Sequence, residues 1–81
     1  MRLAYAERFV KSYAAAPSEI QKAFDRKADL LVQNLRHPSL RAKKYDVSRN
    51  LWQARITLGW RFYFTIEDDT YYLVDVTPHP K

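Results

Sequence analysis

The spacing of apolar residues changes from helical to extended about halfway along this chain. After a short strand expected around residues 2–5, apolar side chains recur every three or four positions, which predicts a first amphipathic helix. The apolar positions of this helix are Ala6, Phe9, Val10 and Tyr13.

A second helix is predicted to begin at Pro17, because proline suits the first helical position and Glu19 places a negative charge in the first turn. The helix should end near Leu35, since Pro38 disfavours helical backbone at His37. Its apolar stripe consists of Ile20, Phe24, Ala28, Leu31 and Leu35. We interpret both stripes as core that faces a sheet; a partner-binding surface is the alternative.

Beyond residue 50 apolar and polar residues alternate at period two, which predicts strands with one buried side and one solvent-facing side. A loop of residues 57–59 is expected to join the first two strands, with Gly59 in the left-handed conformation. Ile56 then pairs with Trp60, and Arg55 faces Arg61 on the solvent side. The opposite side stacks Trp52 on Phe64 and Ala54 on Phe62.

A further strand is expected over residues 70–77, after a turn formed by the acidic residues 67–69. Its pairing sets Arg61 against Thr77 and Tyr63 against Asp75. The same pairing places Tyr72, Val74 and Val76 on the apolar side. His79 should emerge on the solvent side close to Arg61, where Pro78 and Pro80 remove two ladder donors and end the strand.

These elements predict an α+β fold in which two N-terminal helices pack on one face of a small antiparallel sheet, in the order β-α-α-β-β-β-β. A chain of 81 residues without an internal repeat or linker is expected to form one domain spanning residues 1–81. The 47% of apolar residues must form its core, because the chain has no cysteine for a disulfide.

The composition excludes several kinds of site. Two histidines and no cysteines argue against a zinc or iron site, and a single glycine rules out a glycine-rich phosphate loop or dinucleotide fingerprint. No cofactor is therefore expected. Neither a membrane span nor a secretory signal is evident, and the cysteine-free composition suits the cytoplasm. The net charge of +5 favours a polyanionic partner.

The solvent-facing side of the strands carries the candidate chemistry. Arg55 and Arg61 repel each other across the hairpin, so either Asp75 joins them in a surface ion-pair network or the pair binds a phosphate. Tyr63 either stacks on a base or covers the sheet. Three cations on an expected edge strand either hold flanking phosphates or discourage aggregation. These are Arg41, Lys43 and Lys44.

Cations and one imidazole suit the attack of an RNA 2′-hydroxyl on its neighbouring phosphate, which needs proton transfer and stabilisation of negative charge but no metal. Arg55 and Arg61 would stabilise the charge on the phosphorus centre. His79 would exchange a proton with the leaving 5′-oxygen or with the attacking hydroxyl, because histidine changes charge near neutral pH.

The sequence resembles the RelE/ParE superfamily of toxins from toxin-antitoxin systems, and most of all its RelE- and YoeB-like mRNA interferases. The resemblance covers nearly the whole chain, and its most specific part is a set of residues at characteristic separations: Trp52, Arg55, Trp60, Arg61 and His79. It implies two helices on an antiparallel sheet, metal-independent cleavage of mRNA on the ribosome, and a cognate antitoxin that wraps the toxin.

The resemblance also implies roles for single residues. Arg61 matches an arginine that stabilises the cleaved phosphate, His79 matches a proton donor, Arg55 matches an arginine of the same site, and Lys43 and Lys44 resemble lysines found upstream in RelE-like members. Two features depart from the family. No glutamate precedes the tryptophan motif in residues 41–45 to act as general base, and Pro80 stands where many members have a tyrosine. A gyrase-binding toxin and a catalytically silent RNA- or partner-binding member of the same fold remain alternatives.

Overall fold

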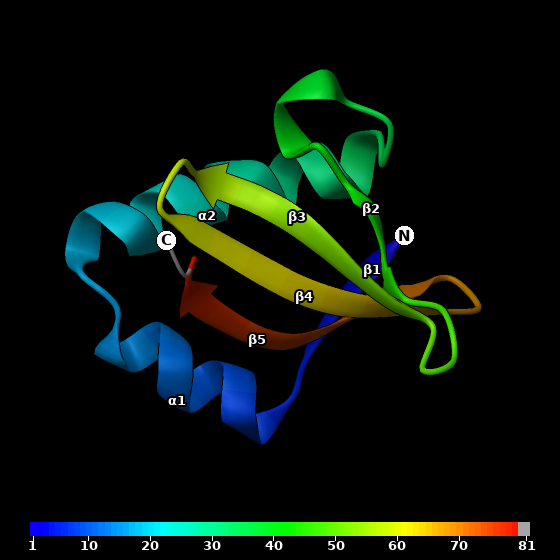
Figure 1. Ribbon diagram of the computed structural model, residues 1–81, viewed down its shortest axis with the longest axis horizontal. Helices are drawn as coiled ribbons and strands as arrows, with labels where there is room; N and C mark the ends of the chain where they lie inside the picture. Colours follow the sequence, from blue (N-terminus) through cyan, green and yellow to red (C-terminus); the bar gives the residue numbers. More distant parts are fainter. Residues whose placement is uncertain (80–81) are drawn as a thin grey trace.

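The computed structural model describes residues 1–79 and has an α+β architecture, with two helices against a five-stranded sheet (Figure 1). The predicted fold class and order of elements are confirmed. The elements are β1 (Arg2–Tyr5), α1 (Glu7–Ala15), α2 (Ser18–Gln33), the short 3-10 helix η1 (Pro38–Leu40), β2 (Lys43–Asp46), β3 (Leu51–Thr57), β4 (Trp60–Glu67) and β5 (Thr70–Pro78). None of the helices in this part of the chain is long and apolar enough to cross a membrane.

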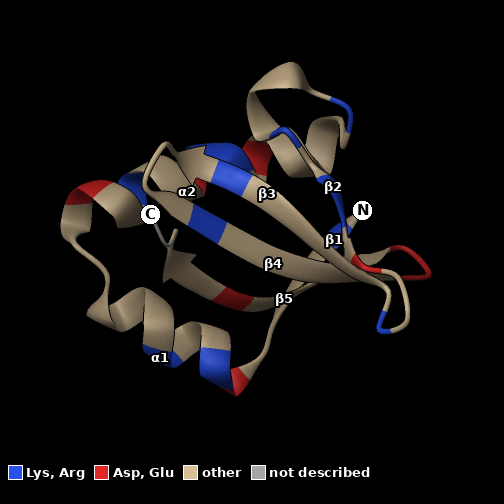
Figure 2. Cartoon of the chain, viewed as in Figure 1, with Lys and Arg blue, Asp and Glu red and all other residues tan. Residues whose placement is uncertain are grey.

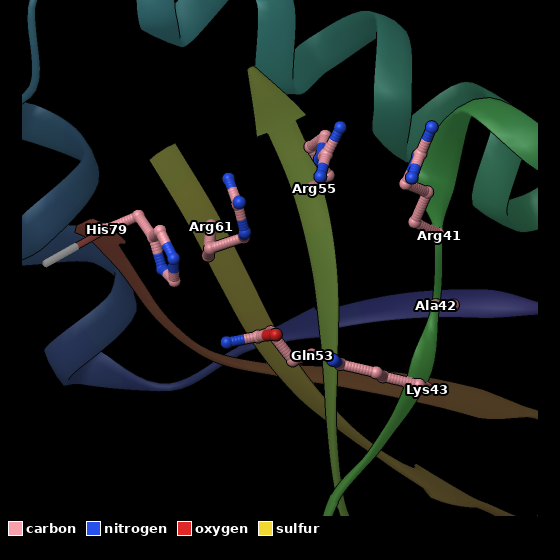
Figure 3. Close-up of a pocket in the computed structure, with 7 residues that line it drawn as sticks. All are labelled: Arg41, Ala42, Lys43, Gln53, Arg55, Arg61 and His79. Atoms are coloured by element: carbon pink, nitrogen blue, oxygen red, sulfur yellow. The ribbon is translucent and has the colours of Figure 1, made fainter. Parts of the chain in front are cut away.

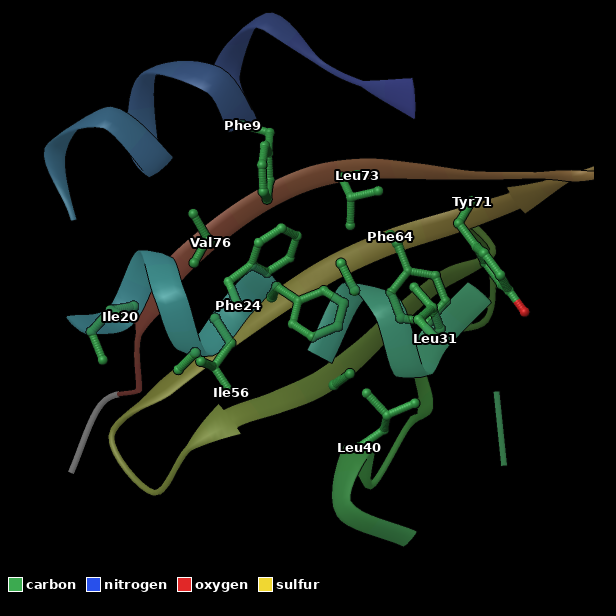
Figure 4. Close-up of a cluster of buried hydrophobic side chains, with 14 of the residues drawn as sticks. Phe9, Ile20, Phe24, Leu31, Leu40, Ile56, Phe64, Tyr71, Leu73 and Val76 are labelled. Atoms are coloured by element: carbon green, nitrogen blue, oxygen red, sulfur yellow. The ribbon is translucent and has the colours of Figure 1, made fainter. Parts of the chain in front are cut away.

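Both helices contribute to one hydrophobic core against the sheet, as the sequence predicted (Figure 4). The ring of Phe9 on α1 lies 5.1 Å from that of Phe24 on α2, which in turn lies 5.2 Å from Phe62 on β4, edge to face. Leu31, Leu40, Phe62, Phe64 and Leu73 are fully buried. One stripe residue differs from the prediction, since Val10 is 54% exposed.

The limits of α2 differ slightly from the prediction. Pro17 precedes the helix as its N-cap residue, with φ −56° and ψ 147°, and Ser18 is the first helical residue. At the other end the backbone N–H of Asn34 donates to the Leu30 carbonyl, and the helix ends at Gln33. The turn towards Pro38 therefore begins two residues earlier than expected.

The strand order in the sheet is β1-β5-β4-β3-β2. Strands β2 to β5 are antiparallel neighbours, as predicted, but β1 pairs with β5 in parallel. The prediction of a wholly antiparallel sheet is therefore wrong at this edge. The chain leaves β1 into α1, crosses behind the sheet through α2, and enters β2 at the opposite edge, so that the last strand is left to pair with the first (Figure 1).

The hairpin of β3 and β4 has the predicted register but a different turn. Arg55 pairs with Arg61, and on the apolar side Ala54 pairs with Phe62. Thr57, however, pairs with Trp60, so Ile56 forms a bulge and only two residues remain in the turn. Gly59 does not have a positive φ. The predicted three-residue loop and left-handed glycine are wrong, and the bulge supplies the extra residue that keeps the register.

A second bulge changes which residues of β5 face the core. Tyr63 pairs with Asp75 as predicted, but Phe64 pairs with Leu73, which leaves Val74 without a direct partner. The side-chain alternation therefore shifts by one residue at Val74. Leu73 is buried and Tyr72 is exposed. The assignment of Tyr72 and Val74 to the apolar side is wrong, whereas that of Val76 is confirmed.

Candidate functional site

The side of the sheet that faces away from the buried aromatic rings, here called the open face, carries a cationic cavity of about 420 Å³ (Figure 3). Its lining comes from four strands or their ends, and four of the side chains are cationic. The lining residues are Arg41, Ala42, Lys43, Gln53, Arg55, Arg61 and His79. Five of the seven residues singled out from the sequence thus line one cavity.

Strand alternation explains the centre of this cavity. Phe62 and Ala54 are buried in the core, so Arg61, one residue before Phe62, and Arg55, one residue after Ala54, project to the open face. Because these two arginines are paired across adjacent strands, their side chains begin about 5 Å apart. Figure 2 shows the two basic positions side by side on β3 and β4.

The edge of the cavity is formed by the segment between α2 and β3. The fully buried Leu40 anchors η1 to the core. Arg41 then adopts a left-handed backbone, with φ 47°, and its N–H donates to the Pro38 carbonyl at 3.3 Å. This turn sends the chain into β2, so that Arg41 and Lys43 approach the cavity from the sheet edge (Figure 3).

Arg61 has a structural role in addition to its place in the cavity. Its residue is only 8% exposed, and Nη1 donates to the carbonyls of Thr57, Leu58 and Trp60 at 2.7, 3.0 and 3.0 Å. The carbonyl of Gly59 in the same turn accepts from the His79 backbone N–H at 2.8 Å. Arg61 therefore holds the turn that positions the backbone of His79.

The surroundings of the Arg55 side chain are less favourable than those of Arg61. Its buried Nε finds no hydrogen-bond partner among residues 1–79. Burial lowers the pKa of Arg55, and the charges of Arg41 and Arg61 lower it further. An anion in the cavity would relieve both the missing hydrogen bond and the repulsion between the three guanidinium groups.

The cationic cluster lacks a neutralising carboxylate within the described chain. None of the ion pairs found there involves Arg41, Lys43, Arg55 or Arg61. Asp75, which the sequence offered as a partner for Arg61, pairs instead with Arg8 of α1 at 3.0 Å. Residues 1–79 also contain no group of three or more His, Cys, Asp or Glu side chains placed to hold a metal ion.

Two of the predicted site residues lie outside the cavity. The ammonium group of Lys44 bonds the Asn50 side chain and lies 5.3 Å from the centre of the Trp52 ring. Because Lys43 and Lys44 are neighbours in a strand, they point to opposite sides of the sheet, and only Lys43 reaches the cavity. Tyr63 lies on the open face in the next row of paired residues, where its hydroxyl accepts from Gln53 Nε2 at 3.1 Å.

Gln53 is the lining residue that the sequence interpretation missed. It is two positions before Arg55 on the same strand, so alternation alone places it on the same face. Its amide connects the cavity to Tyr63.

Several solved structures share this fold. A YoeB/ParE toxin from Agrobacterium tumefaciens matches with a TM-score of 0.82 at 12% identity, covering 99% of this chain and 100% of that one. YafQ from E. coli strain BL21(DE3) matches with a TM-score of 0.80 at 16% identity, covering 98% of this chain and 94% of the other. RelE in the RelB-RelE complex of Methanococcus jannaschii matches with a TM-score of 0.77 at 21% identity, over 93% and 88% of the two chains.

The protein therefore shares its fold with these RelE, YoeB/ParE and YafQ structures, and this is the fold that the sequence resemblance implied. No protein-family model and no curated protein sequence matches the chain.

Proposed function

We propose that this protein is the toxin of a toxin-antitoxin system, formed as one domain by residues 1–81, and that it cleaves translated mRNA without a metal ion. The observation that carries the proposal is the cavity in which Arg41, Lys43, Arg55 and Arg61 converge with His79 and find no carboxylate partner in the described chain. A concave cluster of unneutralised cations binds phosphate groups, and the single imidazole beside it supplies a proton-transfer group.

The reaction that suits this equipment is an internal transesterification. The RNA 2′-oxygen attacks the adjacent phosphorus, the bond from phosphorus to the 5′-oxygen breaks, and the products are a 2′,3′-cyclic phosphate and a 5′-hydroxyl. Arg55 and Arg61 stabilise the extra negative charge that develops on the phosphate oxygens. His79 donates a proton to the leaving 5′-oxygen.

The proton of the attacking 2′-hydroxyl has no assigned acceptor in the protein. Neither aspartate nor glutamate is among the described residues that line the cavity, in keeping with the missing glutamate before the tryptophan motif. The cations favour loss of this proton by stabilising the resulting alkoxide, and water can carry it away. This absence is also the observation that favours a second candidate, an RNA-binding protein of the same fold that does not cleave.

The proposed partners are a cognate antitoxin, the ribosome and its mRNA. RelE from M. jannaschii is crystallised with RelB, and YafQ from E. coli with DinJ. A net charge of +5 suits an acidic antitoxin segment as well as RNA, and both would compete for the same cations.

Induced expression in a bacterial host tests the function. The wild-type protein is expected to stop growth, whereas Arg55→Ala and His79→Gln should relieve the arrest while retaining a native circular dichroism spectrum. Arg26→Ala is the matched control, because it removes one exposed arginine from α2, away from the cavity lining. Equal toxicity of all four proteins would remove the cavity from the mechanism.

Mapping RNA ends in the same cells separates the candidates. Cuts within translated codons support ribosome-dependent cleavage. Intact mRNA with growth arrest supports a different target, such as the gyrase expected of a ParE-like toxin, and intact mRNA bound by the protein supports the silent candidate.

A further inference from the structure

A second pocket of about 260 Å³ lies on the open face beside the cationic cavity. Tyr63 and Asp75 form one row of paired residues across the sheet, and Arg61 and Thr77 form the next. These rows are separated by about 7 Å along the strands, since each residue advances the chain by about 3.4 Å. The second pocket is therefore adjacent to the cavity on the scale of one nucleotide.

Two tyrosines form a corner in this pocket. The rings of Tyr45 and Tyr63 lie 5.2 Å apart at an interplanar angle of 69°. Tyr45 is 56% exposed on the edge strand β2, so the hydrophobic core does not account for its aromatic ring. A flat ligand can lie on the face of one ring while it meets the edge of the other. Nucleobases bind to exposed aromatic rings in this way.

A buried carboxylate provides the polar part of the pocket. Asp75 is only 7% exposed, and its two oxygens accept from the Val76 N–H at 2.9 Å and from Arg8 Nε at 3.0 Å. A carboxylate has about four lone-pair positions, so Asp75 retains the capacity to accept further hydrogen bonds. Arg8 compensates its charge, which reduces repulsion from nearby phosphates.

Gln53 connects the two sites. Its side chain lines the cationic cavity, and its Nε2 donates to the Tyr63 hydroxyl at 3.1 Å. The phosphate and the base of one nucleotide could thus be held on opposite sides of this hydrogen bond, with the phosphate among the arginines and the base at the tyrosines.

We propose that this pocket binds the nucleobase next to the phosphate held in the cationic cavity, and that Asp75 selects bases that carry an exocyclic amino group. Adenine, cytosine and guanine can donate such a hydrogen to a carboxylate, whereas uracil carries the acceptor O4 where cytosine has its amino group and keeps only the ring N3–H as a donor. The inference rests on the proposed function and adds a base subsite and its selectivity to it.

Binding of short single-stranded oligonucleotides tests the subsite. Fluorescein-labelled hexamers with 2′-deoxyribose, which cannot be cleaved by 2′-oxygen attack, are titrated at low salt, and anisotropy is measured. Wild-type protein should bind oligo-dA and oligo-dC about tenfold more tightly than oligo-dU, the effect of one hydrogen bond to a base. Tyr45→Ala should weaken all three by about fivefold or more, because stacking is lost. Asp75→Asn should reduce the preference over uracil, because an NH₂ group that cannot accept a hydrogen bond replaces one carboxylate oxygen, and its circular dichroism spectrum checks that the fold survives the loss of the Arg8 pair.

Tyr5→Ala is the control, because Tyr5 is also an exposed tyrosine but lies in a different pocket, beside Phe9. If wild-type protein binds these oligonucleotides, Arg55→Ala weakens them, and Tyr45→Ala and Asp75→Asn match wild type, the subsite is wrong and the phosphate site stands. If wild-type protein binds none of them and leaves translated mRNA intact, the proposed function and the subsite both fail.

Discussion

Replacing each of the two paired arginines with methionine should change stability in opposite directions. Methionine retains a long apolar stem and removes the guanidinium group. In the structure the Arg61 guanidinium is used by the turn, since Nη1 donates to three carbonyls, whereas Arg55 Nε has no partner within residues 1–79. The pair therefore separates a cation that supports the fold from one that opposes it.

The loss for Arg61→Met can be estimated from its hydrogen bonds. A hydrogen bond to a charged group contributes about 1.5–3 kcal/mol when buried. The two hydrogens of Nη1 are shared among three carbonyls in a turn that water can reach, so we expect a total loss of about 1–2 kcal/mol. The midpoint of urea unfolding should fall by roughly 1–2 M if the slope is about 1 kcal/mol per M.

Arg55→Met should raise the same midpoint, because it removes an unpaired buried nitrogen and the repulsion from Arg41 and Arg61. Part of this gain in stability is electrostatic. It should become smaller when the salt concentration is raised from about 0.1 M to about 1 M, because the screening length then falls from about 10 Å to about 3 Å. Both variants should bind RNA less tightly than wild type. A stabilised Arg61→Met together with a destabilised Arg55→Met would refute these assignments.

Three further predictions concern single positions. Gly59→Ala should be tolerated and should stabilise the protein by about 0.4–1 kcal/mol in urea unfolding, since Gly59 lacks a positive φ and an added Cβ meets no described atom within 4 Å; a loss of 1 kcal/mol or more would contradict this backbone. Hydrogen bonds from Ser48 and, next in size, from Arg49 lower the pKa of Asp46 from 3.8 to about 2, so the stability that this carboxylate contributes is present above about pH 4 and is lost as the pH falls through about 2. An NMR titration of Asp46 should show this midpoint, and Ser48→Ala should raise it; a midpoint near 3.8 in both proteins would contradict the hydrogen bonds. Lys43→Ala should weaken RNA binding several-fold more than Lys44→Ala, because only Lys43 lines the cavity, and equal effects would indicate a general charge contribution.

Side-chain alternation was sufficient to predict which residues pair at the centre of the candidate site. The opposition of Arg55 and Arg61, and that of Tyr63 and Asp75, follow from which residues must face the core, and these pairs are present. The same rule could have excluded Lys44 from the site that contains Lys43, because neighbouring strand residues point to opposite sides.

The bulges could not be predicted from alternation. The extra residues at Ile56 and Val74 interrupt the period of two, and they depend on how the paired strands twist locally, which the pattern of apolar and polar residues does not record. The parallel pairing of β1 with β5 joins Arg2 to Thr70, a separation over which the local pattern carries no information. The partner of Asp75 was missed for the same reason, since Arg8 is on α1.

Chemical analysis of mRNA ends in a reconstituted translation reaction tests the central claim most directly. With wild-type protein, we expect new 3′ ends that carry a 2′,3′-cyclic phosphate, and with His79→Gln or Arg55→Ala we expect few or none. Undamaged mRNA in the presence of folded wild-type protein, or new ends of another chemistry that persist in both variants, would contradict the assignment of the cationic cavity as the site of RNA cleavage.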